Sequence, residues 1–115
     1  MKDGMNSEDS NDISLRVKRP RAMRALRRSS VRKKIAEYLF DISPTYSYTS
    51  EIAYHVQTTS SNVIGAIRGS RPRYKPEESL LELGIVEEKN CGPRIKLYGL
   101  TDFGREMIES IKPPK

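Results

Sequence analysis

The sequence contains few of the residues that hold many small proteins together. Among its 115 residues there is no tryptophan, one cysteine and one histidine. The single Cys91 cannot form a disulfide within the chain, and Cys91 with His55 cannot supply the four protein ligands of a structural zinc ion. No stretch approaches the roughly 18 apolar residues of a transmembrane helix, and the N-terminus lacks the apolar segment of a signal peptide. We therefore expect a cytoplasmic protein that binds neither a metal nor a membrane.

The residue patterns of common enzymes are also missing. No Ser–His–Asp set, glycine-rich phosphate loop or metal-ligand spacing is present. His55 lies in the middle of a predicted helix, and the glutamates are scattered at solvent-type spacing, so paired carboxylates have no evident site. We expect no enzymatic activity, no cofactor and no small-molecule ligand.

Positive charge is abundant, but it is confined to one segment of the chain. The net charge is +6. Residues 1–12 carry a charge of −3 and residues 37–115 a charge of −1, whereas residues 13–36 contain ten bases and no acid. Such a segment can bind a phosphate backbone and release its counterions. We predict a disordered or conditionally helical N-terminal arm over residues 1–28. Its candidate phosphate-binding bases are Arg16, Lys18, Arg19, Arg21, Arg24, Arg27 and Arg28.

Hydrophobic periodicity and capping residues predict one domain over residues 29–112, followed by a short tail at 113–115. Three helices come first, separated by a short strand in TYSY and by the turn QTTSS. The expected N-terminal caps of these helices are Ser29 or Ser30, Thr49 and Ser60. The third helix is expected to bury Val63, Ile64 and Ile67.

The second half of the chain predicts a further helix, a hairpin and a closing helix. PEESLLEL is helical in pattern and ends at Gly84. IVEEK and RIKLY read as two short strands around the tight turn NCGP, and Thr101 is expected to cap the last helix. The predicted fold is mainly α with a small β-hairpin.

Two short helices joined by a tight turn and followed by a hairpin make a helix-turn-helix with a wing. The stretches that carry this arrangement are YTSEIAYHVQTTSSNVIGAI, LLELGIVEE and IKLYGLTDFGREMI. Over roughly residues 30–111 the chain thus resembles the winged-helix DNA-binding domains of prokaryotic transcription regulators, of the broad kind that includes the MarR and ArsR families. One departure is the insert RGSRPRYKPEE, which resembles a variant found in archaeal winged-helix proteins.

The resemblance implies that the third helix of this chain enters the DNA major groove. With its aliphatic residues in the core, the opposite face would carry polar and small residues at helical spacing. Asn can pair with adenine and Arg with guanine, and hydroxyls at the helix N-terminus can hold a phosphate. The predicted contacts are Ser60, Ser61, Asn62, Gly65 and Arg68.

The insert and the wing are expected to contact phosphates beside the groove. The insert supplies Arg71, Arg73, Tyr74 and Lys75 on a loop stiffened by proline. Tyr74 could alternatively anchor that loop on the core. The wing supplies Arg94 and Lys96, although Glu87 and Glu88 on the opposing strand can pair with these bases.

These features predict sequence-specific binding of double-stranded DNA by a nucleoid-associated transcription regulator. The resemblance also implies a homodimer, whose symmetry would set the spacing of DNA half-sites. Two alternatives stay open. A winged helix can serve as a protein–protein or assembly module, because a fold does not fix its function. The arginine-rich arm could instead bind RNA.

Overall fold

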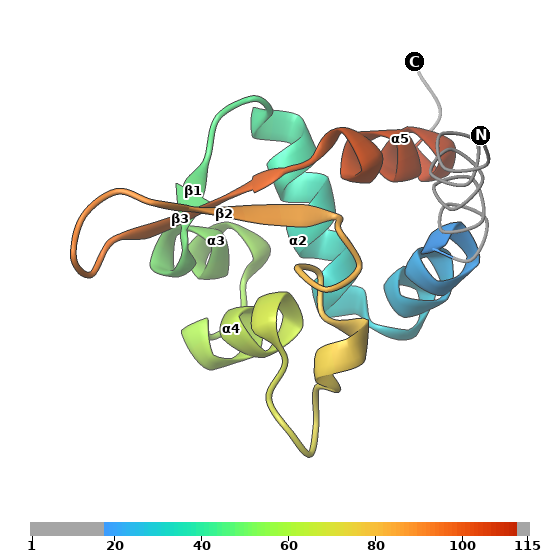
Figure 1. Ribbon diagram of the computed structural model, residues 1–115, viewed down its shortest axis with the longest axis horizontal. Helices are drawn as coiled ribbons and strands as arrows, with labels where there is room; N and C mark the ends of the chain where they lie inside the picture. Colours follow the sequence, from blue (N-terminus) through green and yellow to red (C-terminus); the bar gives the residue numbers. More distant parts are fainter. Residues whose placement is uncertain (1–17, 113–115) are drawn as a thin grey trace, which may run out of the picture.

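A computed structural model describes residues 18–112 (Figure 1). Residues 18–28 are helical. The elements that follow are α2 (Ser30–Ile42), β1 (Ser47–Tyr48), α3 (Thr49–Val56), α4 (Ser60–Arg68), the short 3-10 helix η1 (Pro76–Glu78), β2 (Val86–Asn90), β3 (Lys96–Leu100) and α5 (Asp102–Ile111). Helices α3 and α4 form the helix-turn-helix, and β2 with β3 forms the wing. The predicted fold class, a mainly α winged helix-turn-helix, is confirmed.

Helices α2, α3 and α4 pack around one apolar core. Ile35, Ile52 and Val63, one from each helix, are fully buried. Ser29 caps α2 by accepting a hydrogen bond from the backbone N–H of Arg32, as expected. The expected caps of the next two helices are wrong by one residue. Thr49 is the first residue of α3, and Thr59 instead of Ser60 caps α4 by accepting from the backbone N–H of Asn62.

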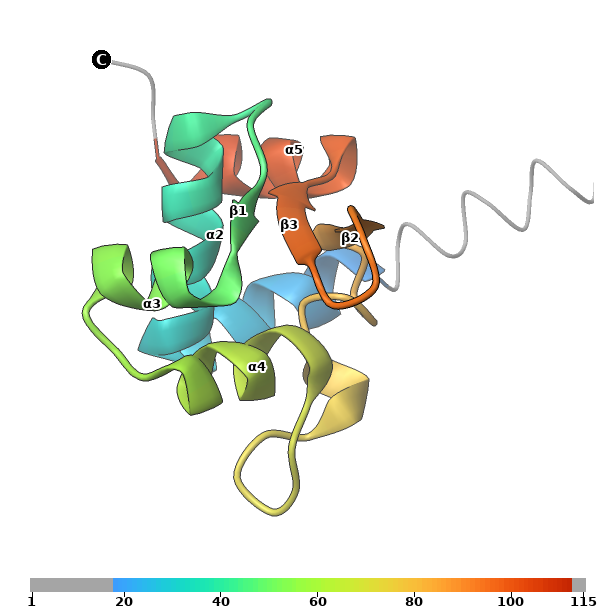
Figure 2. The same ribbon diagram turned by 90° about the vertical axis from the view of Figure 1, so that its left-hand side faces the viewer.

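The strands form one antiparallel sheet in the order β1-β3-β2. β1 is only two residues long and pairs Ser47 with Tyr98, which confirms the short strand expected in TYSY. The wing hairpin pairs Val86 with Leu100 and Asn90 with Lys96. Its turn extends to the left of Figure 1 beyond α3 and α4, and Figure 2 shows the hairpin from its tip.

The prediction of a helix in PEESLLEL is wrong beyond its first turn. Only Pro76–Glu78 form the 3-10 helix η1, and residues 80–84 are turns. The reason is a competing set of hydrogen bonds: the N–H groups of Leu80 and Leu81 donate to the carbonyls of Ala66 and Ile67, each at 3.0 Å. These two N–H groups satisfy free carbonyls at the C-terminal end of α4. They are therefore not available for the hydrogen bonds of a helix in residues 79–83.

The helix over residues 18–28 is part of the same core. Ala22, Ala25 and Leu26 are buried, so residues 18–28 of the predicted arm form a helix packed on the domain and are not a disordered segment. A lone helix of this length would be marginal in water, and here the three side chains are part of the domain's core cluster. Arg16 lies outside the described residues. Within residues 18–112, none of the helices has the length and apolar character that crossing a membrane requires.

Candidate nucleic-acid interface

A cleft of about 740 Å³ lies between α4 and the wing. One wall is the exposed side of α4, which contributes Ser60, Ile64 and Arg68. These residues are four apart, so they form a single row along the helix. The end of β1 and the first turn of α3 add Tyr48, Thr49 and Ser50. The cleft therefore joins both helices of the helix-turn-helix.

The wing forms the opposite wall of this cleft with Arg94, Ile95, Lys96 and Tyr98. The lining thus contains three cations, several hydroxyls and no carboxylate. It also contains exposed apolar side chains, since Ile64 is 44% and Ile95 53% exposed. Among the described residues, no group of three or more His, Cys, Asp and Glu side chains is placed to hold a metal ion. Hydroxyls, cations and aliphatic groups together match a sugar-phosphate strand with base edges beside it.

The other flank of α4 is covered by the part of the insert that follows this helix, residues 69–78. A Cβ atom built on Gly65 would meet the ring of Tyr74, with Cε2 at 2.9 Å. Asn62 donates to Thr58 Oγ1 at 2.9 Å, and its Oδ1 accepts from Tyr74 OH at 3.4 Å. The prediction that Ser61, Asn62, Gly65 and Arg68 share one open face is therefore wrong. Ser61 and Arg68 are exposed, whereas Gly65 is buried and Asn62 half-buried.

The insert is folded back on the domain and is not an open loop. Ser70 and Tyr74 exchange backbone hydrogen bonds at 2.7 and 2.8 Å, which closes a tight loop. The chain enters this loop at Gly69, whose φ of 93° lies in a backbone region that residues other than glycine rarely adopt. Of the predicted phosphate contacts, Arg71, Arg73 and Lys75 are all exposed, and Arg71 pairs with Glu77 at 3.1 Å. Tyr74 packs against the core, as in the alternative in which it anchors the loop.

A buried arginine holds the insert from below. Arg32 of α2 has a side chain only 5% exposed and lies 3.8 Å from Glu78, which also pairs with Arg28 at 3.3 Å. Its guanidinium carbon is 5.6 Å from the centre of the Tyr74 ring. Burial lowers the pKa of Arg32 below its ordinary value, while the charge of Glu78 opposes that shift. In the sequence, Arg32 is one of the ten bases of residues 13–36. Only the packing shows that its side chain is buried and supports the insert.

Arg68 is held by the wing. Its Nε donates to the hydroxyl of Tyr98 at 3.3 Å, and its Nη2 donates to Glu88 at 2.5 Å. The Tyr98 hydrogen bond is the main cause that raises the pKa of Arg68. Glu88 also lies 3.7 Å from Lys96, so the expected pairing of a wing carboxylate with a wing base is present. This network joins the C-terminal end of α4 to both strands of the hairpin.

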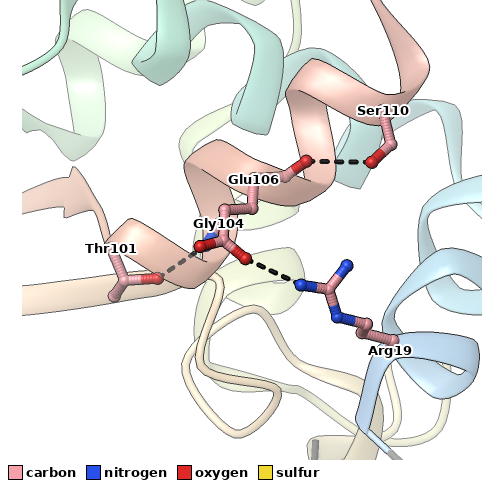
Figure 3. A network of polar contacts seen from close by, with 5 residues as sticks. All are labelled: Arg19, Thr101, Gly104, Glu106 and Ser110. Atoms are coloured by element: carbon pink, nitrogen blue, oxygen red, sulfur yellow. Dashed lines mark hydrogen bonds and ion pairs between the residues drawn. The ribbon is translucent and has the colours of Figure 1, made fainter. Parts of the chain in front are cut away.

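The bases of the N-terminal helix lie far from the cleft. Figure 1 shows this helix beside α5, at the opposite end of the molecule from the wing. Arg19 pairs with Glu106 of α5 at 2.8 Å (Figure 3), and Lys18 lies 5.9 Å from the centre of the Phe103 ring. Arg21, Arg24, Arg27 and Arg28 are exposed. These bases form a second positive surface that is separate from the cleft.

Several cleft residues were missed by the sequence reasoning. Ile64 was assigned to the core because it is aliphatic, but Val63 and Ile67, at 0% and 1% exposure, already fill the buried side together with Ala66. Adjacent residues on a helix point about 100° apart, so Ile64 must face elsewhere. Strict i, i+4 counting could have found it. Tyr48, Thr49, Ser50 and Ile95 carry no such signal, because only the tertiary fold brings them to α4.

Comparison with known proteins places the chain in a family. An uncharacterized protein of Methanocaldococcus jannaschii is 40% identical over 100 residues, covering 87% of this chain and 89% of that protein. No solved structure matches the chain. The profile of the EarA-like family matches residues 22–111, which include the N-terminal helix as well as the winged helix. This chain belongs to the EarA-like family.

Proposed function

We propose that this protein binds double-stranded DNA in a sequence-specific manner and acts as a transcription regulator. The observation that carries the proposal is the cleft between α4 and the wing. It is lined by Arg68, Arg94 and Lys96, with the hydroxyls of Ser60, Thr49 and Ser50 beside them. This combination suits a phosphodiester strand, because cations and hydroxyls are the common partners of phosphate oxygens.

The dimensions of the helix-turn-helix support the same function. A helix with its side chains is about 10–12 Å across, which fits a major groove about 12 Å wide, and the nine residues of α4 give it a length of about 13 Å. With α4 in that groove, the wing lies beside the adjacent groove, and one DNA strand passes through the cleft between them. The exposed Ser61 and Arg68 of α4 then face the bases, and Arg94 and Lys96 face the backbone.

One observation favours a second function, the binding of another protein. Tyr48, Ile64 and Ile95 are large, exposed and apolar, and all three line the cleft. A helical peptide with apolar residues at i, i+4 spacing would bury them as a groove-binding partner does. The cationic lining opposes this function unless the peptide is acidic. We therefore rank it second.

A selection from random duplexes tests the primary proposal. The full-length protein is expected to enrich a short sequence, and that duplex should outcompete structured RNA and single strands of the same length at about 150 mM salt. Equal affinity for all three polyanions would show that binding is a nonspecific electrostatic attraction. Binding to the RNA alone would transfer the function to the arginine-rich helix.

A matched pair of variants shows whether the cleft is responsible. Arg68→Ala with Arg94→Ala removes two cations from the cleft, while Lys33→Ala with Lys34→Ala removes two exposed cations of α2 that do not line it. The net charge changes equally. We expect the first pair to abolish the preference for the selected duplex and the second to leave that preference intact. An equal loss in both would contradict binding in the cleft.

A further inference from the structure

Ile64 occupies the centre of the open side of α4. It is flanked by Ser60 one turn before and by Arg68 one turn after, and all three line the cleft. A single exposed aliphatic residue needs no explanation on its own. This one is in the middle of the helix that faces the ligand, where a polar residue would be better solvated. Its position calls for an apolar group on the ligand.

Arg68 presents a guanidinium that is already oriented. Tyr98, which is 3% exposed, fixes its Nε, and Glu88 fixes one hydrogen of Nη2. In the described part of the chain its Nη1 donates to no protein group, and Arg68 lines the cleft, so this nitrogen is available to a ligand there. A side chain held by two strands loses little conformational entropy when it binds. Such preorganisation favours a planar acceptor pair.

DNA offers both complements on its major-groove edge. Thymine carries the C5-methyl group there, and guanine carries the paired acceptors O6 and N7. Positions i and i+4 of a helix are separated by about 6 Å along its axis. Successive base pairs are separated by about 3.4 Å. Two residues spaced like Ile64 and Arg68 therefore reach base pairs that are one or two steps apart.

We propose that Ile64 recognises a thymine methyl group and that Arg68, positioned by Glu88 and Tyr98, recognises a guanine one or two base pairs away. This inference rests on the proposed function, because it names the base pattern that the same cleft would select. It assigns specificity to Ile64, which has no hydrogen-bonding group, and a positioning role to Glu88, which need not touch DNA.

Base analogues in the selected duplex test each contact separately. Deoxyuridine in place of each thymine, one at a time, removes only the methyl group, and 7-deazaguanine in place of each guanine removes only N7. We expect one thymine position to lose affinity about fourfold on the loss of its methyl group. One guanine one or two base pairs away should lose about fivefold or more.

Variants of the full-length protein then assign these effects to residues. Ile64→Ala should make the sensitive thymine position indifferent to its methyl group while the 7-deazaguanine effect persists. Ile95→Ala removes the other exposed isoleucine of the cleft. It can lower the overall affinity, but the loss of affinity on removing the methyl group or N7 should stay the same. Glu88→Gln should reduce the guanine effect and spare the thymine effect.

Two kinds of failure can be told apart. If no duplex is enriched at all, the proposed function is wrong and this inference falls with it. If a duplex is enriched but no thymine is sensitive to its methyl group, or Ile64→Ala leaves that sensitivity unchanged, DNA binding stands and the assignment of Ile64 is overturned.

Discussion

The two flanks of α4 have opposite environments: one is covered by the protein itself and the other is open. On one flank Asn62 and Gly65 lie against Tyr74, and every polar group of the Asn62 side chain points to a protein partner. On the other flank Ser60, Ile64 and Arg68 line an open cleft. An asparagine and a glycine, which suit a DNA-reading surface, are covered, while an isoleucine is exposed.

The difference is caused by the insert. It returns along α4 after Gly69, and its Glu78 pairs with Arg32 of α2. Leu80 and Leu81, which follow it, donate hydrogen bonds to the last carbonyls of α4. Both views place this loop on the side of α4 away from the sheet (Figures 1 and 2). The insert thus determines which flank of α4 remains available. Substitutions on the covered flank should change stability, and those on the open flank should change binding.

The largest effect is expected from Tyr74→Ala. It removes a partly buried ring that covers Gly65 and approaches Arg32, and we expect it to lower the free energy of unfolding by about 2 kcal/mol. Urea denaturation followed by circular dichroism measures this loss. Tyr74→Phe keeps the ring and should cost about 0.5 kcal/mol. Unchanged stability in Tyr74→Ala with a loss of DNA affinity would return Tyr74 to the DNA interface.

A smaller effect on stability is expected from Glu78→Gln. This change removes the carboxylate charge beside the buried guanidinium of Arg32, at a cost of about 1 to 2 kcal/mol. Glu77→Gln is the matched control, because Glu77 and its neighbour Arg71 are both exposed and an exposed ion pair contributes little to stability. Thermal and urea unfolding of both variants measure the contrast. Equal stability of the two variants would show that Arg32 does not depend on Glu78.

The smallest effect concerns the wing side of the cleft. Arg94→Ala should flatten the plot of log K against log salt by about 0.9, the slope of one phosphate contact. Lys96→Ala should change the slope less, because Glu88 lies 3.7 Å from its ammonium group and partly neutralises it. Titrations of the selected duplex between about 50 and 200 mM salt measure both slopes. A larger change of slope in Lys96→Ala than in Arg94→Ala would mean that the ion pair between Glu88 and Lys96 breaks when DNA binds.

The local signals in the sequence determined much of the fold. The apolar spacing of α2, α3 and α5 and the caps Ser29 and Thr101 are read correctly. The breakers mark the wing turn, but Asn90 belongs to β2, and Arg94 and Ile95 lie in the turn instead of in the second strand. Each depends on residues a few positions apart, whose geometry is fixed by the helix or the turn itself. The winged helix-turn-helix follows from their order.

Long-range contacts decided the rest. Arg32 and Tyr74 are 42 positions apart, and no local pattern states that one lies beneath the other. In the sequence, residues 18–28 resemble a charged arm, but in the folded domain Ala22, Ala25 and Leu26 belong to the hydrophobic core. Which flank of α4 stays open depended on the insert. A helical pattern fixes the direction of a side chain relative to its own axis, but what it meets there is set by segments distant in the sequence.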